Sequence, residues 1–236
     1  MRIDFLTIFP NLFSGFLEYG LIHQAQEKKV LQLRVHDLRD FTTDRHRSVD
    51  DVSYGGGPGM VFKPEPVFQA VEAIREKDAL IVLPSPQGVI FNQKIAEELA
   101  VTPQLIFLCA RYEGVDERIC EHLVDREVSI GDFVVMGGEF PAMLMTEAVT
   151  RLVPGVVGCP DSLTAESFRE PLLDFPHYTR PEDFRGWKVP DVLLSGHHEE
   201  IRRWRRKMAL KRTKERRPDL FEKLKLTKED RVLLDE

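Results

Sequence analysis

Short apolar segments alternate with helical ones along the first two thirds of the chain. The pattern predicts strands and helices in turn over residues 2–9, 11–28, 31–35, 65–77, 79–83, 92–100, 104–110, 115–123, 128–135 and 141–152. The segments 79–83 and 104–110 are continuous apolar runs, which is typical of parallel strands covered on both faces. This order predicts an α/β fold with a parallel sheet. A long polar segment, 37–54, interrupts it, and such loops are usually functional or mobile.

Three of the predicted strands end in turns that differ from plain connectors. They are Pro84-Ser85-Pro86-Gln87-Gly88, Ala110-Arg111-Tyr112-Glu113-Gly114 and the glycine-rich segment 131–138. Ligands of open α/β sheets bind at the carboxyl ends of strands, so three such turns at one edge predict one pocket.

Another glycine-rich turn is Tyr54-Gly55-Gly56-Gly57-Pro58-Gly59-Met60. Glycine lets a backbone approach a ligand closely or adopt positive φ without strain, although an ordinary tight turn also explains either glycine-rich segment alone. No phosphate motif is present, because Phe62 stands where Gly-x-Gly-x-x-Gly needs its last glycine and Gly-Lys-Ser/Thr does not occur. A pocket of Gly, Pro and backbone amides suits a neutral adenosine-type ligand, and S-adenosylmethionine is one candidate.

The C-terminal part of the chain predicts a small, mostly helical unit. Segment 154–176 has no clear periodicity and is interpreted as a linker, and a helix begins near His197. The core expected for this unit consists of the segments 189–194 and 220–234 and the helix stripe Ile201, Trp204 and Met208.

Charge is distributed unevenly along the chain. The net charge is −6, yet segment 197–217 holds ten Lys or Arg against three Glu. The arginines of this tract are Arg202, Arg203, Arg205, Arg206, Arg212, Arg216 and Arg217. A basic helix on an acidic body favours contact with the phosphates of a nucleic acid, and the alternative is a solvated helix face.

Other function classes find little support in the sequence. No apolar run approaches the length of a membrane span, and the N-terminus lacks a signal-peptide pattern, so we expect a cytoplasmic protein. Cys109, Cys120 and Cys159 form no Cys-x-x-Cys pair, which argues against a zinc site or a disulfide framework.

Seven motifs together resemble one known family. They are Tyr54–Met60, Ser85–Gly88, Arg111–Gly114, Ser129–Asp132, Gly137–Glu139, His177–Pro181 and Ser195–Glu200. In this order, and nearly end to end, the chain resembles the bacterial tRNA (guanine-N1)-methyltransferases, the TrmD family. Seven motifs at once make the resemblance highly specific.

The resemblance implies the fold, assembly and substrate of this family. It implies a SPOUT-type parallel sheet tied into a deep trefoil knot, an exception to the rule against threaded chains. It also implies a homodimer with active sites shared between subunits, and methylation by S-adenosylmethionine of the guanine immediately 3′ of the anticodon in tRNA. Magnesium is a further expectation of the family. The implied parts are a donor-binding domain over 1–158, a linker over 159–176 and a tRNA-binding domain over 177–236.

The donor pocket implied by the resemblance comprises Pro84, Ser85, Pro86, Gln87, Gly88, Ala110, Tyr112, Glu113, Gly114, Ile130, Gly131, Asp132, Phe133, Val134, Val135, Gly137, Gly138 and Pro141. Two positions depart from the family pattern. Ala110 stands where the family usually has glycine, and Met136 where it usually has a small residue. A methyl group at residue 110 is tolerable provided that φ there stays negative.

Methylation of guanine N1 needs a general base for the ring proton and a cation near the oxygen that gathers charge. By resemblance the cation is Arg151, which could equally be a helix C-terminal arginine. The family base is an aspartate before Ser-Phe, and the matching residue here is Glu166. Asp161 is its rival, and a third interpretation makes Glu166 a solvated carboxylate only.

The substrate contacts that we expect on the same grounds are His46, Asp50, Gly55, Gly56, Gly57, Pro58, Gly59, Ser162, His177, Arg180, Arg202, Arg203 and Arg206. For either histidine alone a structural role is the more common one.

Two other functions stay open at this point. One is an RNA-binding module that kept the pocket without turnover, and the other is a ribose 2′-O methyltransferase of the same fold.

Overall fold

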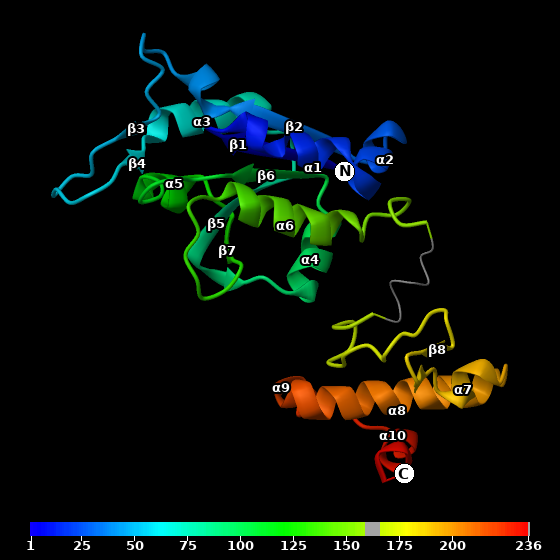
Figure 1. The fold of residues 1–236 in the computed structure, drawn as a ribbon. Coiled ribbons are helices and arrows are strands. Elements are labelled where there is room, and N and C mark those ends of the chain that lie inside the picture. Colours follow the sequence, from blue (N-terminus) through cyan, green and yellow to red (C-terminus); the bar gives the residue numbers. More distant parts are fainter. Residues whose placement is uncertain (159–165, 236) are drawn as a thin grey trace. The chain divides into compact units, whose positions relative to one another are not determined.

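A computed structural model describes residues 1–158 and 166–235 of the chain. The chain divides into two compact units, Met1–Gly158 and Cys159–Glu236, each of which is described by itself (Figure 1). Among the described residues, no helix combines the length and apolar character that crossing a bilayer requires.

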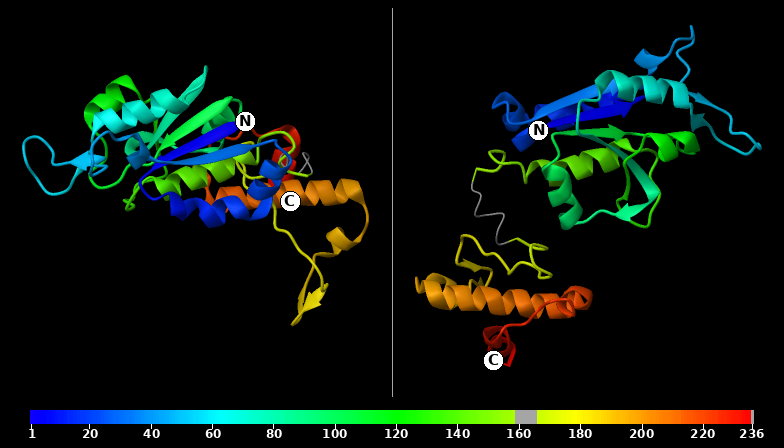
Figure 2. Two further views of the ribbon diagram at one scale, coloured as in Figure 1. Left: turned by 90° about the horizontal axis from the view of Figure 1, so that it is seen from above. Right: turned by 180° about the vertical axis from the view of Figure 1, so that it is seen from behind.

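The first unit is built on a five-stranded sheet with strand order β2-β1-β6-β5-β7, in which every paired strand runs parallel. The strands are β1 (Arg2–Thr7), β2 (Gln32–Asp37), β5 (Ala79–Ile90), β6 (Gln104–Leu108) and β7 (Arg126–Ser129). The predicted parallel α/β sheet is therefore confirmed. A short antiparallel pair, β3 (Asp50–Asp51) and β4 (Val61–Phe62), lies outside it. The segment between β3 and β4 extends away from the sheet in both views of Figure 2.

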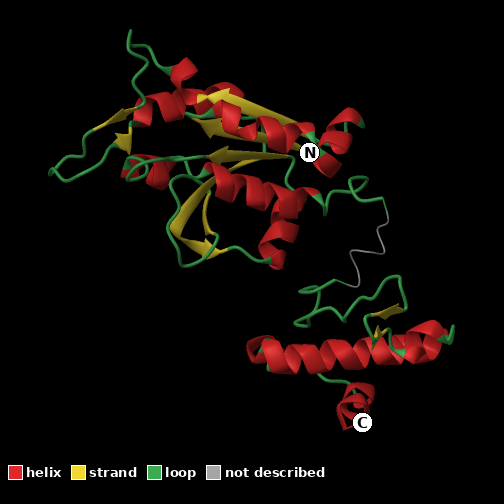
Figure 3. Ribbon diagram, viewed as in Figure 1, coloured by secondary structure: helices red, strands yellow, loops and turns green. Residues whose placement is uncertain are grey.

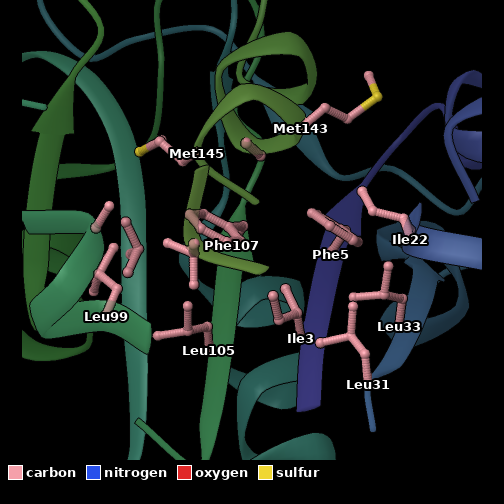
Figure 4. Packing of buried hydrophobic residues seen from close by; sticks show 14 of the residues in the cluster. Ile3, Phe5, Ile22, Leu31, Leu33, Leu99, Leu105, Phe107, Met143 and Met145 are labelled. Atoms are coloured by element: carbon pink, nitrogen blue, oxygen red, sulfur yellow. The ribbon is translucent and has the colours of Figure 1, made fainter. Parts of the chain in front are cut away.

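Helices cover both faces of this sheet. They are η1 (Pro10–Phe13), α1 (Ser14–Glu18), α2 (Gly20–Glu27), η2 (Leu38–Phe41), α3 (Pro64–Ile74), α4 (Gln93–Ala100), α5 (Glu117–His122) and α6 (Glu139–Thr150). Because side chains alternate along a strand, Ile3 and Phe5 pack on one face with α2, α4 and α6 (Figure 4). Leu6 and Ile8 pack on the other face with α3 and α5.

Three element predictions for this unit were wrong in their bounds. The helix expected over 11–28 is broken, because Tyr19 is extended and Gly20 has a φ of +70°. The strand expected over 128–135 ends at Ser129, before Gly131 at a φ of +137°. The turn expected after Leu83 lies inside β5, where Pro84 and Val89 both register with Val128. Residues 85–88 therefore bulge out of the strand.

The second unit is mostly helical and adds one small strand pair (Figure 3). Its elements are β8 (Asp183–Phe184), β9 (Trp187–Lys188), α7 (Asp191–Leu194), α8 (His198–Arg216), α9 (Pro218–Phe221) and α10 (Lys228–Asp235). The fully buried side chains of α8 are Ala209, Leu210 and Thr213, whereas the predicted stripe of Ile201, Trp204 and Met208 is only half-buried. The core thus lies nearer the C-terminal half of α8 than the apolar spacing suggested.

Part of the expected linker packs on α8. The amide of Leu173 donates to Thr213 Oγ1 at 2.8 Å, and Arg212 donates to the carbonyl of Asp174 at 3.2 Å. The segment 166–175, which belongs to the linker expected over 159–176, is therefore attached to the second unit. Apolar periodicity could not predict this attachment, because irregular segments are held by individual hydrogen bonds and not by a repeating apolar face.

Candidate functional site

A cavity of about 220 Å³ lies in the first unit where the bulge of β5 meets the loops after β6 and β7. Its lining residues are Pro84, Ser85, Pro86, Ala110, Arg111, Tyr112, Glu113, Gly114, Val128, Ser129, Ile130, Gly131, Phe133, Val134, Val135, Met136, Gly137, Gly138 and Pro141. The three turns singled out in the sequence thus form one cavity, as expected for the carboxyl edge of a parallel sheet.

Three of the expected donor-pocket residues do not line this cavity. Gln87 and Asp132 are exposed side chains. Gly88 faces β7 instead, since a Cβ built on it would lie 2.3 Å from backbone atoms of Glu127 and Val128. The cavity also has walls that the sequence interpretation omitted, namely Arg111, Val128, Ser129 and Met136. Arg111 and Ser129 belong to two of the seven motifs, so membership of a motif could have identified them as lining residues.

The loops after β6 and β7 approach each other so closely that glycine is required. The amide of Gly138 donates to the carbonyl of Ala110 at 2.8 Å, and Arg111 forms an antiparallel bridge with Gly137. A Cβ on Gly138 would lie 2.9 Å from Cys109 Cα, closer than real Cβ atoms come. Ala110 itself has no positive φ, so its methyl group is compatible with the loop.

The chemistry of this cavity fits the adenosyl donor implied by the family. Its walls are mainly backbone amides and apolar side chains, which recognise a neutral ligand by shape and a few hydrogen bonds. At Gly114, where φ is +107°, a Cβ position has no protein atom within 4 Å. Room for a ligand therefore remains beside this backbone. The cationic side chain in the wall, Arg111, is paired with Glu139 at 2.9 Å.

The long loop expected to hold substrate adjoins this cavity. The amide of Glu113 donates to the carbonyl of Met60 at 3.0 Å, and the amide of Phe62 donates to the carbonyl of Gly114 at 3.0 Å. The glycine-rich turn between β3 and β4 is exposed, and its glycines Gly55, Gly56, Gly57 and Gly59 all have positive φ. A Cβ on Gly59 would lie 2.5 Å from Glu113 Cγ. His46 and Asp50 lie on the same loop and its first strand.

Arg151 and Glu166 lie in different units. Arg151 is half-buried and caps the C-terminus of α6 in the first unit. Glu166 is half-buried and lines a second cavity of about 540 Å³ between segment 166–175 and α8. The arginines that line this cavity are Arg169, Arg202, Arg205 and Arg206. Asp161 and Ser162 lie outside the described residues.

Two of the arginines expected to meet phosphate are engaged in ion pairs. Arg206 Nε contacts Asp230 at 2.7 Å and its Nη1 contacts Glu170 at 3.0 Å. Arg202 Nη2 contacts Glu199 at 2.6 Å and Glu229 at 3.1 Å. The hydrogen bond from Arg206, with burial opposing it, lowers the pKa of Asp230 to about 2. The exposed arginines of α8 include Arg203, Arg205 and Arg216.

The remaining predicted contacts lie on the surface of the second unit. His177 is exposed, its Nε2 lies 2.8 Å from Asp174 Oδ2, and its ring centroid lies 4.5 Å from that of Phe175. Arg180 is also exposed. Over residues 1–158 and 166–235, no three His, Cys, Asp or Glu side chains gather as a metal-binding group.

Comparison with known proteins identifies the family. Residues 1–223 match the family model described as tRNA (Guanine-1)-methyltransferase TrmD. A tRNA (guanine-N(1)-)-methyltransferase of Dictyoglomus turgidum is 57% identical over 236 residues, which are 100% of this chain and 96% of the relative. Relatives with the same name from Dehalococcoides mccartyi and Brevibacillus brevis are each 54% identical, covering 100% of this chain and 96% and 98% of their own lengths. The chain belongs to the tRNA (guanine-1)-methyltransferase TrmD family.

Proposed function

We propose that this protein transfers a methyl group from S-adenosylmethionine to N1 of the guanine immediately 3′ of the anticodon in tRNA. Membership of the family supports the reaction. The observation that carries the proposal is the cavity, in which the three turns shared with the family converge at the carboxyl edge of the sheet. When bound there, S-adenosylmethionine supplies an electrophilic methyl group on a sulfonium.

The protein's part in the reaction is proton removal and charge stabilisation. The new N–C bond forms as the methyl group leaves the sulfonium sulfur, and guanine N1 loses its proton while the electron pair of the N–H bond stays on the nitrogen. Glu166 accepts this proton, and Arg151 stabilises the charge that develops on the guanine oxygen. The half-buried position of Glu166 in a cavity lined by arginines supports a role beyond that of a solvated carboxylate. Magnesium stays an expectation of the family, and no residue of this chain is assigned to it.

The second unit holds tRNA in this proposal. Arg203, Arg205 and Arg216 are its exposed phosphate contacts on α8. Arg202 and Arg206 are held by carboxylates of α8, α10 and segment 166–175. Their first role is to keep these elements together. His177, Arg180, His46, Asp50 and the exposed glycine turn form the surface for the base and its neighbours.

A homodimer and a knotted sheet belong to the proposal as well. The exposed side of helix α6 carries Phe140 and Leu144, which are 63% and 51% exposed, together with Glu147. In the neighbouring loop Val134 and Met136 are 93% and 87% exposed. Apolar surface of this kind typically marks a protein interface. A subunit contact over α6 would bring a partner beside the donor cavity, which supports active sites shared between subunits.

The decisive experiment is nucleoside analysis of the product. We expect an unmodified tRNA transcript incubated with the protein and S-adenosylmethionine to yield 1-methylguanosine. A transcript with adenine at the target position is the control and stays unmethylated. A 2′-O-methylated product would establish the ribose methyltransferase instead, and tRNA binding without methyl transfer would establish the RNA-binding module.

Replacing the general base tests its assignment. Glu166→Gln keeps the shape of the side chain and removes the proton acceptor, so single-turnover methyl transfer should fall by about 10²–10⁴-fold with tRNA and donor affinity near wild type. Glu166→Asp restores the residue of the family and should retain much of the activity. A severe loss in Asp161→Asn together with a mild one in Glu166→Gln would move the role to Asp161.

A further inference from the structure

Glu139 is a fully buried carboxylate beneath the donor cavity, and the proposed chemistry does not use it. It is the first residue of α6 and 0% exposed. Among the described residues of the first unit, the other buried acidic residue is Asp4. A buried carboxylate is costly unless charged and polar partners surround it. The residues that contact Glu139 therefore indicate its role.

The partners of Glu139 come from two other parts of the sheet edge. Thr7, the last residue of β1, donates its hydroxyl to Glu139 Oε1 at 2.8 Å and accepts the amide of Phe9 at 2.9 Å. Arg111 Nε donates to the same Oε1 at 3.1 Å and lies 2.9 Å from Oε2. Glu139 thus joins β1, the loop after β6 and the start of α6.

Arg111 extends this connection into the cavity wall. Its guanidinium lies 4.6 Å from the ring centroid of Phe9, and Nη1 donates to the carbonyl of Met136 at 3.4 Å. Gly137 allows the approach, since a Cβ there would lie 2.3 Å from Arg111 Nε and 2.7 Å from Glu139 Oε2. One guanidinium, oriented by one carboxylate, therefore ties the two cavity loops to each other.

We propose that Glu139 is a positioning residue for donor binding, which acts by holding Arg111 against Met136 and Gly137. This inference rests on the proposed donor cavity. With the carboxylate gone, Arg111 loses its counter-charge and turns toward solvent, so the loop 131–138 is no longer fixed against 110–114. The cavity must then be ordered by the ligand itself, which weakens binding. The reacting methyl group and the proton acceptor are untouched.

The test compares two buried carboxylates that are each paired with arginine. Glu139→Gln removes the charge under the cavity, whereas Asp4→Asn removes one that contacts Arg2 at 2.7 Å, His36 at 2.7 Å and Gln104 at 2.7 Å nearer the amino end of β1. Calorimetric binding of S-adenosylhomocysteine to the full chain gives the affinity, and thermal unfolding gives the stability loss of each variant.

We expect Glu139→Gln to weaken S-adenosylhomocysteine binding by about 10-fold or more, as the loss of a charged hydrogen bond predicts. The KM for the donor should rise in parallel while the KM for tRNA stays at the wild-type value. Asp4→Asn should lose stability but bind the probe as wild type does. Thr7→Val, which removes a single hydroxyl, should weaken binding by about 3-fold or more and serves if Glu139→Gln fails to fold.

Equal weakening in Glu139→Gln and Asp4→Asn would overturn the inference, because both effects would then follow from stability. Wild-type affinity in Glu139→Gln, or in Thr7→Val where that variant stands in for it, would overturn it as well. If the wild-type protein itself neither binds S-adenosylhomocysteine nor methylates tRNA, the proposed function is wrong, and the inference on Glu139 is wrong with it. Failure of the proposed function is therefore seen in the wild-type protein, whereas failure of the inference alone is seen only in the variants.

Discussion

Replacing Asp230 with asparagine tests how α10 is held on α8. Arg206 donates through Nε and Nη2 to the two carboxylate oxygens of Asp230 at 2.7 and 3.0 Å, and Asp230 is 2% exposed. The amide of Thr227 adds a third hydrogen bond at 3.0 Å. Asparagine keeps the size of the side chain and an acceptor for Thr227 but leaves Arg206 without its buried counter-charge. Removing one partner of a buried ion pair in this way is strongly destabilising.

The magnitude follows from the pKa of Asp230. The difference between 3.8 and a folded-state pKa of about 2 corresponds to about 2 kcal/mol of stability at neutral pH. Because the folded-state pKa lies below the unfolded-state one, this contribution is complete above about pH 5 and is lost as the pH falls through about 2. The asparagine variant has no carboxylate to protonate, so its stability should lack this part of the acid dependence.

Tryptophan fluorescence makes the measurement specific, because Trp187 and Trp204 are the two tryptophans of the chain and both belong to the second unit. At pH 7 we expect the urea midpoint of Asp230→Asn to lie about 1–2 M below that of wild type. Asp219→Asn is the matched control, since its pair with Arg217 at 2.6 Å is exposed, and should keep the wild-type midpoint. Equal midpoints for the two variants would refute the reasoning.

Two further predictions concern the first unit. Gly88→Ala should destabilise it by about 3 kcal/mol, because the new Cβ would lie 2.3 Å from the backbone of β7. Gly15→Ala, at a helical site with no atom within 4 Å of the Cβ position, should be neutral or stabilising by up to about 1 kcal/mol. Chemical denaturation followed by circular dichroism compares them, and equal stability would contradict the account of Gly88. Leu144→Lys on the exposed side of α6 should convert a dimer to monomers in sedimentation velocity, whereas Val101→Lys, at a residue 83% exposed after α4, should not. A wild-type monomer, or equal effects of both variants, would contradict the interface.

The sheet and the cavity could be predicted because their signals are local. Continuous apolar runs mark strands covered on both faces, and residues such as Gly114 and Gly131 mark the loops that follow β6 and β7. Since all these strands run parallel, their carboxyl ends meet at one edge, and one cavity follows from topology alone. The TrmD resemblance, read from the same turns, is confirmed by the family match over residues 1–223.

What the sequence could not show depends on contacts between distant residues. Glu139 closes a motif along the chain, but its burial becomes evident only when Thr7 and Arg111 are brought to it by β1 and β6. In the sequence, Arg206 is one of several basic residues predicted on a helix, whereas in the structure it pairs with Asp230 and Glu170. Charge patterning counts such residues as available for RNA, because an ion pair between elements leaves no periodic trace in the sequence.

The glycines around the cavity explain how the proposed donor site can accommodate side-chain departures from the family pattern. Gly137 and Gly138 are required because a Cβ would strike Arg111 or Cys109, and Gly114 and Gly131 because their φ values are +107° and +137°. These positions shape the cavity through the backbone. Ala110 takes part through its carbonyl, which accepts from Gly138, and Met136 through its carbonyl, which accepts from Arg111. We therefore expect a backbone cradle held by the pair of Arg111 and Glu139 to tolerate both departures, with its sensitivity concentrated at the glycines and at Glu139.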